Sequence, residues 1–106
     1  MAVEVREAPR QRRFEVYEDD ELAGFADYLV DGDVVSIPHT QVEPARGGRG
    51  LATELIRVTL DTLRDRKAQV LPYCPFVSAY IAKHPEYVPL VPQSARARFG
   101  LPADPV

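Results

Sequence analysis

Hydrophobic and polar positions alternate along much of the first 42 residues, and this pattern predicts strands. The predicted strands are residues 14–17, 21–30 and 34–42. Phe14 and Val16 fall on one face of the first strand, whereas the second carries apolar residues on both faces, as a covered sheet requires. Asp31-Gly32 is typical of a hairpin turn, so the third strand is predicted to run antiparallel to the second. The pattern therefore predicts a three-stranded meander.

After residue 50 the apolar spacing becomes helical, and it predicts a helix over residues 50–67. Its apolar face comprises Ala52, Leu55, Ile56, Thr59, Leu60 and Leu63. Its charged face comprises Glu54, Arg57, Asp61, Arg64 and Asp65, which we expect to form surface ion pairs. A short fourth strand follows at residues 69–73, and the helix before it favours a right-handed crossover that makes this strand parallel to the third.

A second helix is predicted to open at Cys74-Pro75 and to end at Pro85. Its inner side is predicted to comprise Phe76, Val77, Tyr80 and Ile81. Residues 1–13 carry charge with little apolar pattern, so we expect a loosely held arm. Residues 92–106 are expected to be a proline-containing tail, on the surface or disordered, outside a domain of residues 14–91. The predicted fold class is α/β, with a mixed sheet and two helices.

Composition narrows the setting of this domain. A chain of 106 residues is large enough for one core. The single cysteine excludes an internal disulfide and fits a reducing cytosol, and we find no membrane-spanning apolar run, so we expect a cytoplasmic protein. The net charge of −3 argues against general nucleic-acid binding.

The stretch that precedes the first helix is rich in glycine and arginine. A helix start presents unpaired N–H groups to an anion, and Gly47, Gly48 and Gly50 allow the backbone to approach it closely. Arg46 and Arg49 are placed to add charge-assisted hydrogen bonds to phosphate. A Walker-type loop is excluded because Lys and Ser/Thr do not follow the last glycine, and the dinucleotide fingerprint is not met either. An ordinary strand-to-helix loop is the alternative interpretation.

This loop resembles the acyl-CoA loop of the GNAT superfamily of N-acetyltransferases. Gly48-Arg49-Gly50 fills the last three places of the signature, although Ala45 stands where Gln or Arg is usual and Arg46 follows it. Two flanking segments extend the resemblance to the short, single-domain GNAT-like N-acetyltransferases. They are His39-Thr40-Gln41-Val42 before the loop and Tyr73-Cys74-Pro75-Phe76 with Tyr80 after it.

The resemblance implies acetyl-CoA as co-substrate, no metal, and a primary amine as acceptor, either a protein lysine or a small amine. It implies that main-chain groups near Gln41, Val42 and Glu43 pair with the pantetheine arm, and that the pyrophosphate rests on the loop amides. The thioester would then lie near Cys74. The implied CoA-binding residues are Gln41, Val42, Glu43, Arg46, Gly47, Gly48, Arg49, Gly50, Leu51, Ala52, Cys74, Phe76 and Lys83.

Four side chains are candidates for the chemistry, and each has a structural alternative. Cys74, before a helix start that stabilises a thiolate, is a nucleophile, a proton-transfer group or a buried pocket residue. His39 is a candidate general base or a structural histidine, and Glu43 is a second base candidate or an exposed carboxylate. By the resemblance Tyr80 protonates the leaving thiolate, or else it packs. Lys83, with His84, either reaches the adenosine phosphates or caps the second helix.

The interpretation we favour is an acetyl-CoA-dependent N-acetyltransferase in which the amine attacks directly within a ternary complex. A Cys74 acetyl-enzyme is the second mechanism. A non-catalytic sensor or interaction module that binds CoA is the main alternative function, because no general base stands out. We expect a monomer or a weak homodimer.

Overall fold

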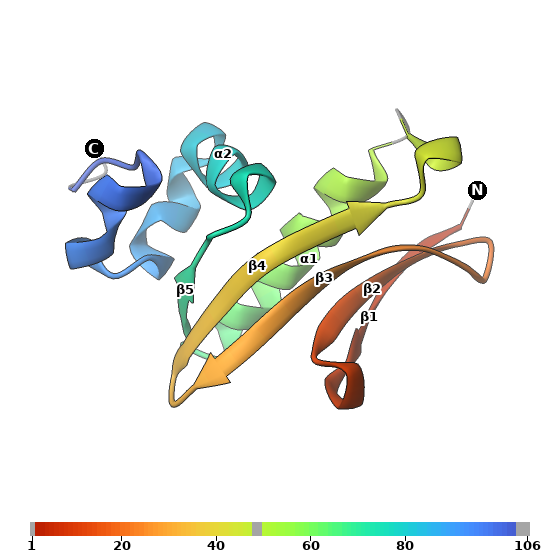
Figure 1. The fold of residues 1–106 in the computed structure, drawn as a ribbon, viewed down its shortest axis with the longest axis horizontal. Coiled ribbons are helices and arrows are strands. Elements are labelled where there is room, and N and C mark those ends of the chain that lie inside the picture. The colour runs from red at the N-terminus through yellow and green to blue at the C-terminus, as the bar shows by residue number, and fades with distance from the viewer. Residues whose placement is uncertain (1, 48–49, 104–106) are drawn as a thin grey trace.

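A computed structural model describes residues 2–47 and 50–103 of the chain. In chain order its elements are β1 (Val3–Ala8), η1 (Pro9–Gln11), β2 (Arg13–Glu18), β3 (Glu21–Asp31), β4 (Val34–Val42), η2 (Pro44–Arg46), α1 (Leu51–Asp65), β5 (Gln69–Leu71), α2 (Pro75–Lys83), η3 (Pro85–Leu90) and η4 (Gln93–Phe99). The strands form one sheet in the order β1-β2-β3-β4-β5. Helix α1 lies against one face of the sheet, and α2, η3 and η4 gather at the β5 end (Figure 1). None of the described helices has the length and apolar composition that a membrane span requires.

The predicted meander and crossover are both present. Strands β2, β3 and β4 are antiparallel neighbours, and the β3–β4 hairpin turns through Gly32, whose φ of +63° favours glycine. Strand β5 is parallel to β4 and pairs with it only from Val34 to Ser36. The prediction of a mixed α/β fold is therefore confirmed, with a fourth strand shorter than expected.

The core lies between the sheet and α1, on what we call the inner face. Leu55, Ile56 and Leu60 of α1 are fully buried, opposite Phe14 and Val16 of β2. The predicted apolar face of the helix is thus confirmed, apart from Ala52, which is half-buried. Burying each such side chain contributes about 2 kcal/mol, so this layer is the main source of stability.

Strand β1 corrects the prediction of a loosely held arm. Its residues pair with β2 in regular register from Val3 with Glu18 to Ala8 with Arg13. Most of its side chains are exposed or half-buried, so the apolar pattern that usually marks a strand is missing. Main-chain pairing holds the strand instead.

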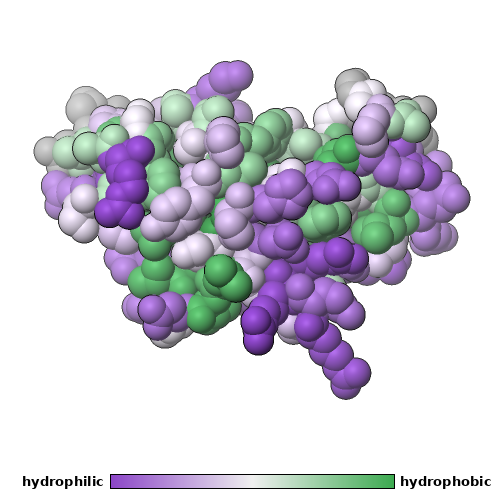
Figure 2. Space-filling model, viewed as in Figure 1, coloured by the Kyte–Doolittle hydropathy of each residue, from purple (hydrophilic) through white to green (hydrophobic). Residues whose placement is uncertain are grey.

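The opposite face of the sheet, the outer face, is not covered by any described helix (Figure 1). The expectation that β3 is covered on both sides is therefore wrong. Leu22 and Leu29 of β3, on this face, are 42% and 55% exposed, respectively. Hydrophobic side chains are visible on this face near the hairpin end of β3 and β4, at the lower left of Figure 2.

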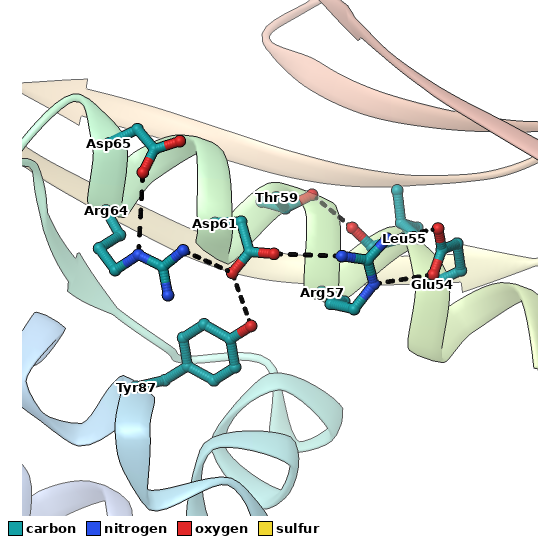
Figure 3. Close-up of polar contacts among 8 residues, drawn as sticks. All are labelled: Glu54, Leu55, Arg57, Thr59, Asp61, Arg64, Asp65 and Tyr87. Carbon is teal, nitrogen blue, oxygen red and sulfur yellow. Dashed lines mark hydrogen bonds and ion pairs between the residues drawn. The ribbon is translucent and has the colours of Figure 1, made fainter.

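The C-terminal segment is part of the core rather than a loose tail. Val88, Val91 and Leu101 are at most 5% exposed, so η3 and the residues on either side of η4 close the end of the molecule beside α2. The Tyr87 hydroxyl donates a 2.6 Å hydrogen bond to Asp61 of α1 (Figure 3). The predicted ion pairs of α1 are present around this contact, from Arg57 to Glu54 and Asp61 and from Arg64 to Asp61 and Asp65.

Candidate functional site

The glycine-rich loop leads into α1 through a left-handed residue. Gly50 is the N-cap of α1 with φ +74°, a conformation that other residues rarely adopt, and no side chain caps the helix. The first-turn N–H groups therefore remain available to an anion. Gly48 and Arg49, which the sequence places in this loop, lie outside the described residues.

Two open cavities adjoin along this loop and α2. One, of about 240 Å³, is lined by the loop, Val42 and the first turn of α1. The other, of about 210 Å³, is lined by the outer side of α2, including Lys83. Thr53 and Phe76 line both cavities, so together these form one depression from the loop to the end of α2. Phe76, predicted to lie on the inner side of α2, is instead 41% exposed at this junction.

Arg46 faces carboxylates in the structure. Its guanidinium bonds to Glu18 at 2.7 Å, Glu21 at 2.9 Å and Glu43 at 2.8 Å. The hydrogen bonds that Arg46 donates to Glu21, Glu43 and Glu18 raise the pKa of Arg46 above its ordinary range. Only 19% of the arginine side chain is exposed, and Glu18 is 2% exposed. The charge expected to meet a phosphate is thus largely neutralised, and the arginine ties the loop to the β2–β3 turn.

The two last strands of the sheet separate beside the cavities. Beyond Ser36 no described strand pairs with β4 on its β5 side, and the N–H of Cys74 donates a 2.8 Å hydrogen bond to the carbonyl of Ile37. Main-chain groups of β4 as far as Val42 therefore border a gap. The Thr40 hydroxyl oxygen is buried and has no hydrogen-bond partner among the described residues.

Cys74 lies at the closed end of this gap. It is the N-cap of α2 and is 6% exposed, with a free thiol. Its carbonyl accepts hydrogen bonds from Val77 and Ser78, which begin the helix. The structure therefore supports the prediction that Cys74 stands at a strand-to-helix junction, in a buried position that suits a pocket residue.

His39 lies on the outer face because β4 carries a bulge. Between the pairs Asp27–His39 and Leu29–Ser36, β3 has one residue and β4 has two. The His39 ring lies 5.9 Å from the Phe25 ring, and its Nε2 atom is 3.3 Å from Oε1 of Gln41. His39 is exposed and thus open to an incoming molecule on the side opposite α1.

The remaining candidates fall in two places. Tyr80 is 8% exposed and lines the cavity on α2, with its ring 4.1 Å from that of His84. Burial, followed by the charge of Asp61, raises the pKa of Tyr80, so its hydroxyl stays protonated at neutral pH. Glu43 is exposed and engaged by Arg46, at the loop end of β4.

Several residues of the site were missed by sequence reasoning. Glu18 and Glu21 form ion pairs with Arg46. From the sequence, Glu18 was assigned only to a turn and Glu21 only to the start of a strand. Thr53 lines both cavities, and its place in the first helical turn after the loop was the signal for it. No group of His, Cys, Asp and Glu residues in the described part of the chain is arranged to hold a metal ion.

A sheet whose last strands diverge beside a glycine-rich helix start has the architecture of a CoA-dependent acyltransferase. The sequence profile of the GCN5-related N-acetyltransferase family matches residues 13–90, about three-quarters of the chain. The chain belongs to this family and is an N-acetyltransferase by that membership.

Three solved structures share the fold. A GCN5-like protein from Staphylococcus aureus aligns with a TM-score of 0.64 at 20% identity, covering 84% of this chain and 87% of its own. The ribosomal-protein-S18-alanine N-acetyltransferase from Escherichia coli gives a TM-score of 0.54 at 23% identity, covering 60% of this chain and 42% of its own. Rv2747 from Mycobacterium tuberculosis, solved with CoA, gives a TM-score of 0.53 at 24% identity, covering 71% of this chain and 48% of its own. The chain thus spans less than half of the last two proteins.

Proposed function

We propose that this chain binds acetyl-CoA in the depression along the loop and α2 and transfers its acetyl group to a primary amine. The observation that carries the proposal is the junction of three features in one place: the uncapped start of α1, the unpaired edge of β4 and the buried Cys74. The uncapped helix start suits the phosphates of acetyl-CoA, and the edge of β4 suits its amide-containing arm. Cys74 marks the place of the thioester.

The described residues fit CoA at specific atoms. The first-turn amides of α1 would hold the pyrophosphate, and Lys83 at the far end of the depression would meet a further phosphate. The pantetheine arm would pair with the free edge of β4, where the buried Thr40 hydroxyl needs a hydrogen-bond partner. Cys74 would line the thioester.

The proposed reaction is direct attack by the neutral amine on the thioester carbonyl carbon. The C–N bond forms, the C–S bond breaks, and CoA leaves as a thiolate. His39, exposed on the outer face, would accept the amine proton. Tyr80, protonated at neutral pH, would return a proton to the thiolate if CoA binding brings the sulfur within reach. Acetyl-CoA and the amine would thus approach from different sides of β4.

A negative charge introduced into the loop tests the binding of acetyl-CoA. Gly47 has an ordinary φ of −65°, and a Cβ there would meet its nearest neighbour at 3.4 Å, so Gly47→Glu should fold while repelling the pyrophosphate. We expect acetyl-CoA at about one hundred times its Kd to stabilise the wild type by about 2.7 kcal/mol and the variant far less, measured by thermal melting. Ala97→Glu, exposed on η4, adds the same charge away from the loop and should keep the full shift.

Turnover separates an enzyme from a CoA sensor. Release of CoA thiol in the presence of a panel of amines, with a background rate without amine, should show acceptor-dependent transfer. His39→Ala should lower kcat with saturating amine, because it removes the group that accepts the amine proton. A melting shift with no acceptor-dependent thiol release would favour the sensor, and no shift at millimolar acetyl-CoA would remove both functions.

The role of Cys74 is tested separately. Direct attack predicts that Cys74→Ala keeps part of the transfer activity and that the intact protein gains no acetyl group when mixed with acetyl-CoA. A stable mass gain of one acetyl group at Cys74, lost in the variant, would support the acetyl-enzyme mechanism instead.

A further inference from the structure

The outer face around His39 carries one acidic group, Asp27, that no described cation neutralises. Asp27 is directly opposite His39 on the neighbouring strand, where side chains of paired residues approach to about 5 Å at Cβ. Asp27 makes no hydrogen bond or ion pair with any residue that the structure describes. Arg13 is opposite Asp27 on β2, but its guanidinium bonds to Glu15 at 2.7 Å and stacks on Phe25.

A cavity of about 240 Å³ opens beside this group. It is lined by Leu22, Ala23, Gly24, Phe25, Gln41 and Glu43. The ring of Phe25 and the side chain of Gln41 both contact His39, so the cavity adjoins the proposed base. The lining is largely apolar, and its one carboxylate, Glu43, also bonds to Arg46. Hydrophilic side chains dominate the middle of the outer face in Figure 2.

Gly24 lines this cavity, but its partner on β2 is the fully buried Val16, so a side chain at this position would point to the inner face. A Cβ at Gly24 would lie 2.5 Å from the carbonyl oxygen of Gln41, so no other residue fits here. Strands β3 and β4 therefore lie close together beside the cavity.

We infer that the outer face is the acceptor site and that it selects an aliphatic primary amine carrying a further positive charge, with Asp27 as the specificity residue. This inference rests on the proposed transferase function. The aliphatic stem would lie beside Phe25, the reacting amine would reach His39, and the second charge would be balanced by Asp27. A lysine residue in a basic peptide and a free diamine both offer this chemistry.

The inference is tested on the wild-type protein with three amines that each have five carbon atoms. With saturating acetyl-CoA, we expect kcat/KM to fall from 1,5-diaminopentane to 1-aminopentane to 5-aminopentanoate. A lysine peptide flanked by lysines, compared with one flanked by glutamates, tells whether a peptide or a free diamine is the better source. An equal rate for all three small amines, or a preference for the anionic one, would overturn the inference while leaving the transferase intact.

The variant Asp27→Asn identifies the residue responsible. We expect the ratio of kcat/KM for the diamine to that for the aminopentanoate to shrink about fivefold, with KM for acetyl-CoA unchanged. Asp31→Asn removes the same charge from the far, hairpin end of β3 and should leave the ratio as in the wild type. If Asp27→Asn and Asp31→Asn give the same ratio, Asp27 has no part in acceptor choice. If no amine accepts the acetyl group, the proposed function itself fails.

Discussion

Glu18 illustrates how one buried charge can organise a ligand loop. A carboxylate that is 2% exposed has lost most of its hydration, a cost that only close ionic and hydrogen-bonded contacts offset. One such contact is with Arg46, 28 residues later, at 2.7 Å. We infer that this pair fixes the start of the glycine-rich loop against the β2–β3 turn, so that Arg46 positions the loop rather than binding the phosphate.

Replacing single carboxylates around Arg46 tests this role. Glu18→Gln should lower the Tm by about 5 °C and raise the Kd for CoA several-fold, because a neutral amide holds the guanidinium less well. Glu21→Gln should change neither by much, since Glu21 is 72% exposed on the same guanidinium. Thermal melting and calorimetric titration with CoA measure both quantities. Tighter CoA binding in Glu18→Gln would show instead that the carboxylate competes with the phosphate for Arg46.

The site was only partly predictable at this scale. The glycines, Cys74 and His39 could be proposed from the sequence because their chemistry is local: a turn, a helix start and a titratable ring. The partner of Arg46 was not, because sequence shows that a side chain is charged but not which distant group it meets in the fold. Asp27 was missed for the same reason, since its relation to His39 exists only through the register of β3 and β4.

At the scale of elements, β1 depends on a side chain near its end as well as on main-chain pairing. Glu7 accepts a 2.6 Å hydrogen bond from the Tyr28 hydroxyl of β3 and an ion pair from Arg66, just after α1. The bond from Arg66 lowers the pKa of Glu7, whereas burial, followed by the bond to Glu7, raises the pKa of Tyr28 to about 12. One carboxylate thus links the edge strand to the core on both sides.

This link predicts a pH-dependent contribution to stability. The folded-state pKa of Glu7 is below its ordinary value of 4.5, so its contribution is present above pH 4.5 and is lost as pH falls through the lowered pKa. Glu7→Gln should therefore cost about 1 kcal/mol of unfolding free energy at pH 7 and progressively less at acid pH. Urea denaturation at a series of pH values measures this difference.

Glu4 provides the matched control for this prediction. It lies on the same strand and also bonds to an arginine, Arg6, but it is 59% exposed. Glu4→Gln should leave the stability unchanged at every pH. An equal loss in both variants would mean that general charge, and not the contact with Arg66 and Tyr28, stabilises the strand.

The accuracy of the element predictions follows from how each element is held. Strands β2 to β4 and helix α1 bury one face, and burial leaves the alternating or helical pattern that sequence analysis detects. Strand β1 buries little and was missed. The segment η3 contains two prolines, and neither η3 nor η4 has a regular apolar pattern. Tyr87, Val88 and Leu90 of η3 and Ala95 of η4 are nevertheless buried, which no periodicity could reveal.

At the scale of the whole molecule, the sheet separates two surfaces with opposite roles in the proposed reaction. The depression at the start of α1 suits an anionic co-substrate, whereas Asp27 on the outer face suits a cationic acceptor. The two meet only at the bulge and gap of β4, near Ile37 and His39.

This arrangement requires the C-terminal segment to hold α2 in place, because α2 carries Cys74 at its start. Leu101 is 5% exposed in the core next to η4, so Leu101→Ala should cost about 2–3 kcal/mol of unfolding free energy. Leu22→Ala, at a side chain 42% exposed on the outer face, should cost about 0.5 kcal/mol or less. Urea denaturation of both variants distinguishes a structural segment from a dispensable tail. Equal stability of Leu101→Ala and the wild type would mean that α2 is held without this segment, and the site would then be complete in a shorter chain.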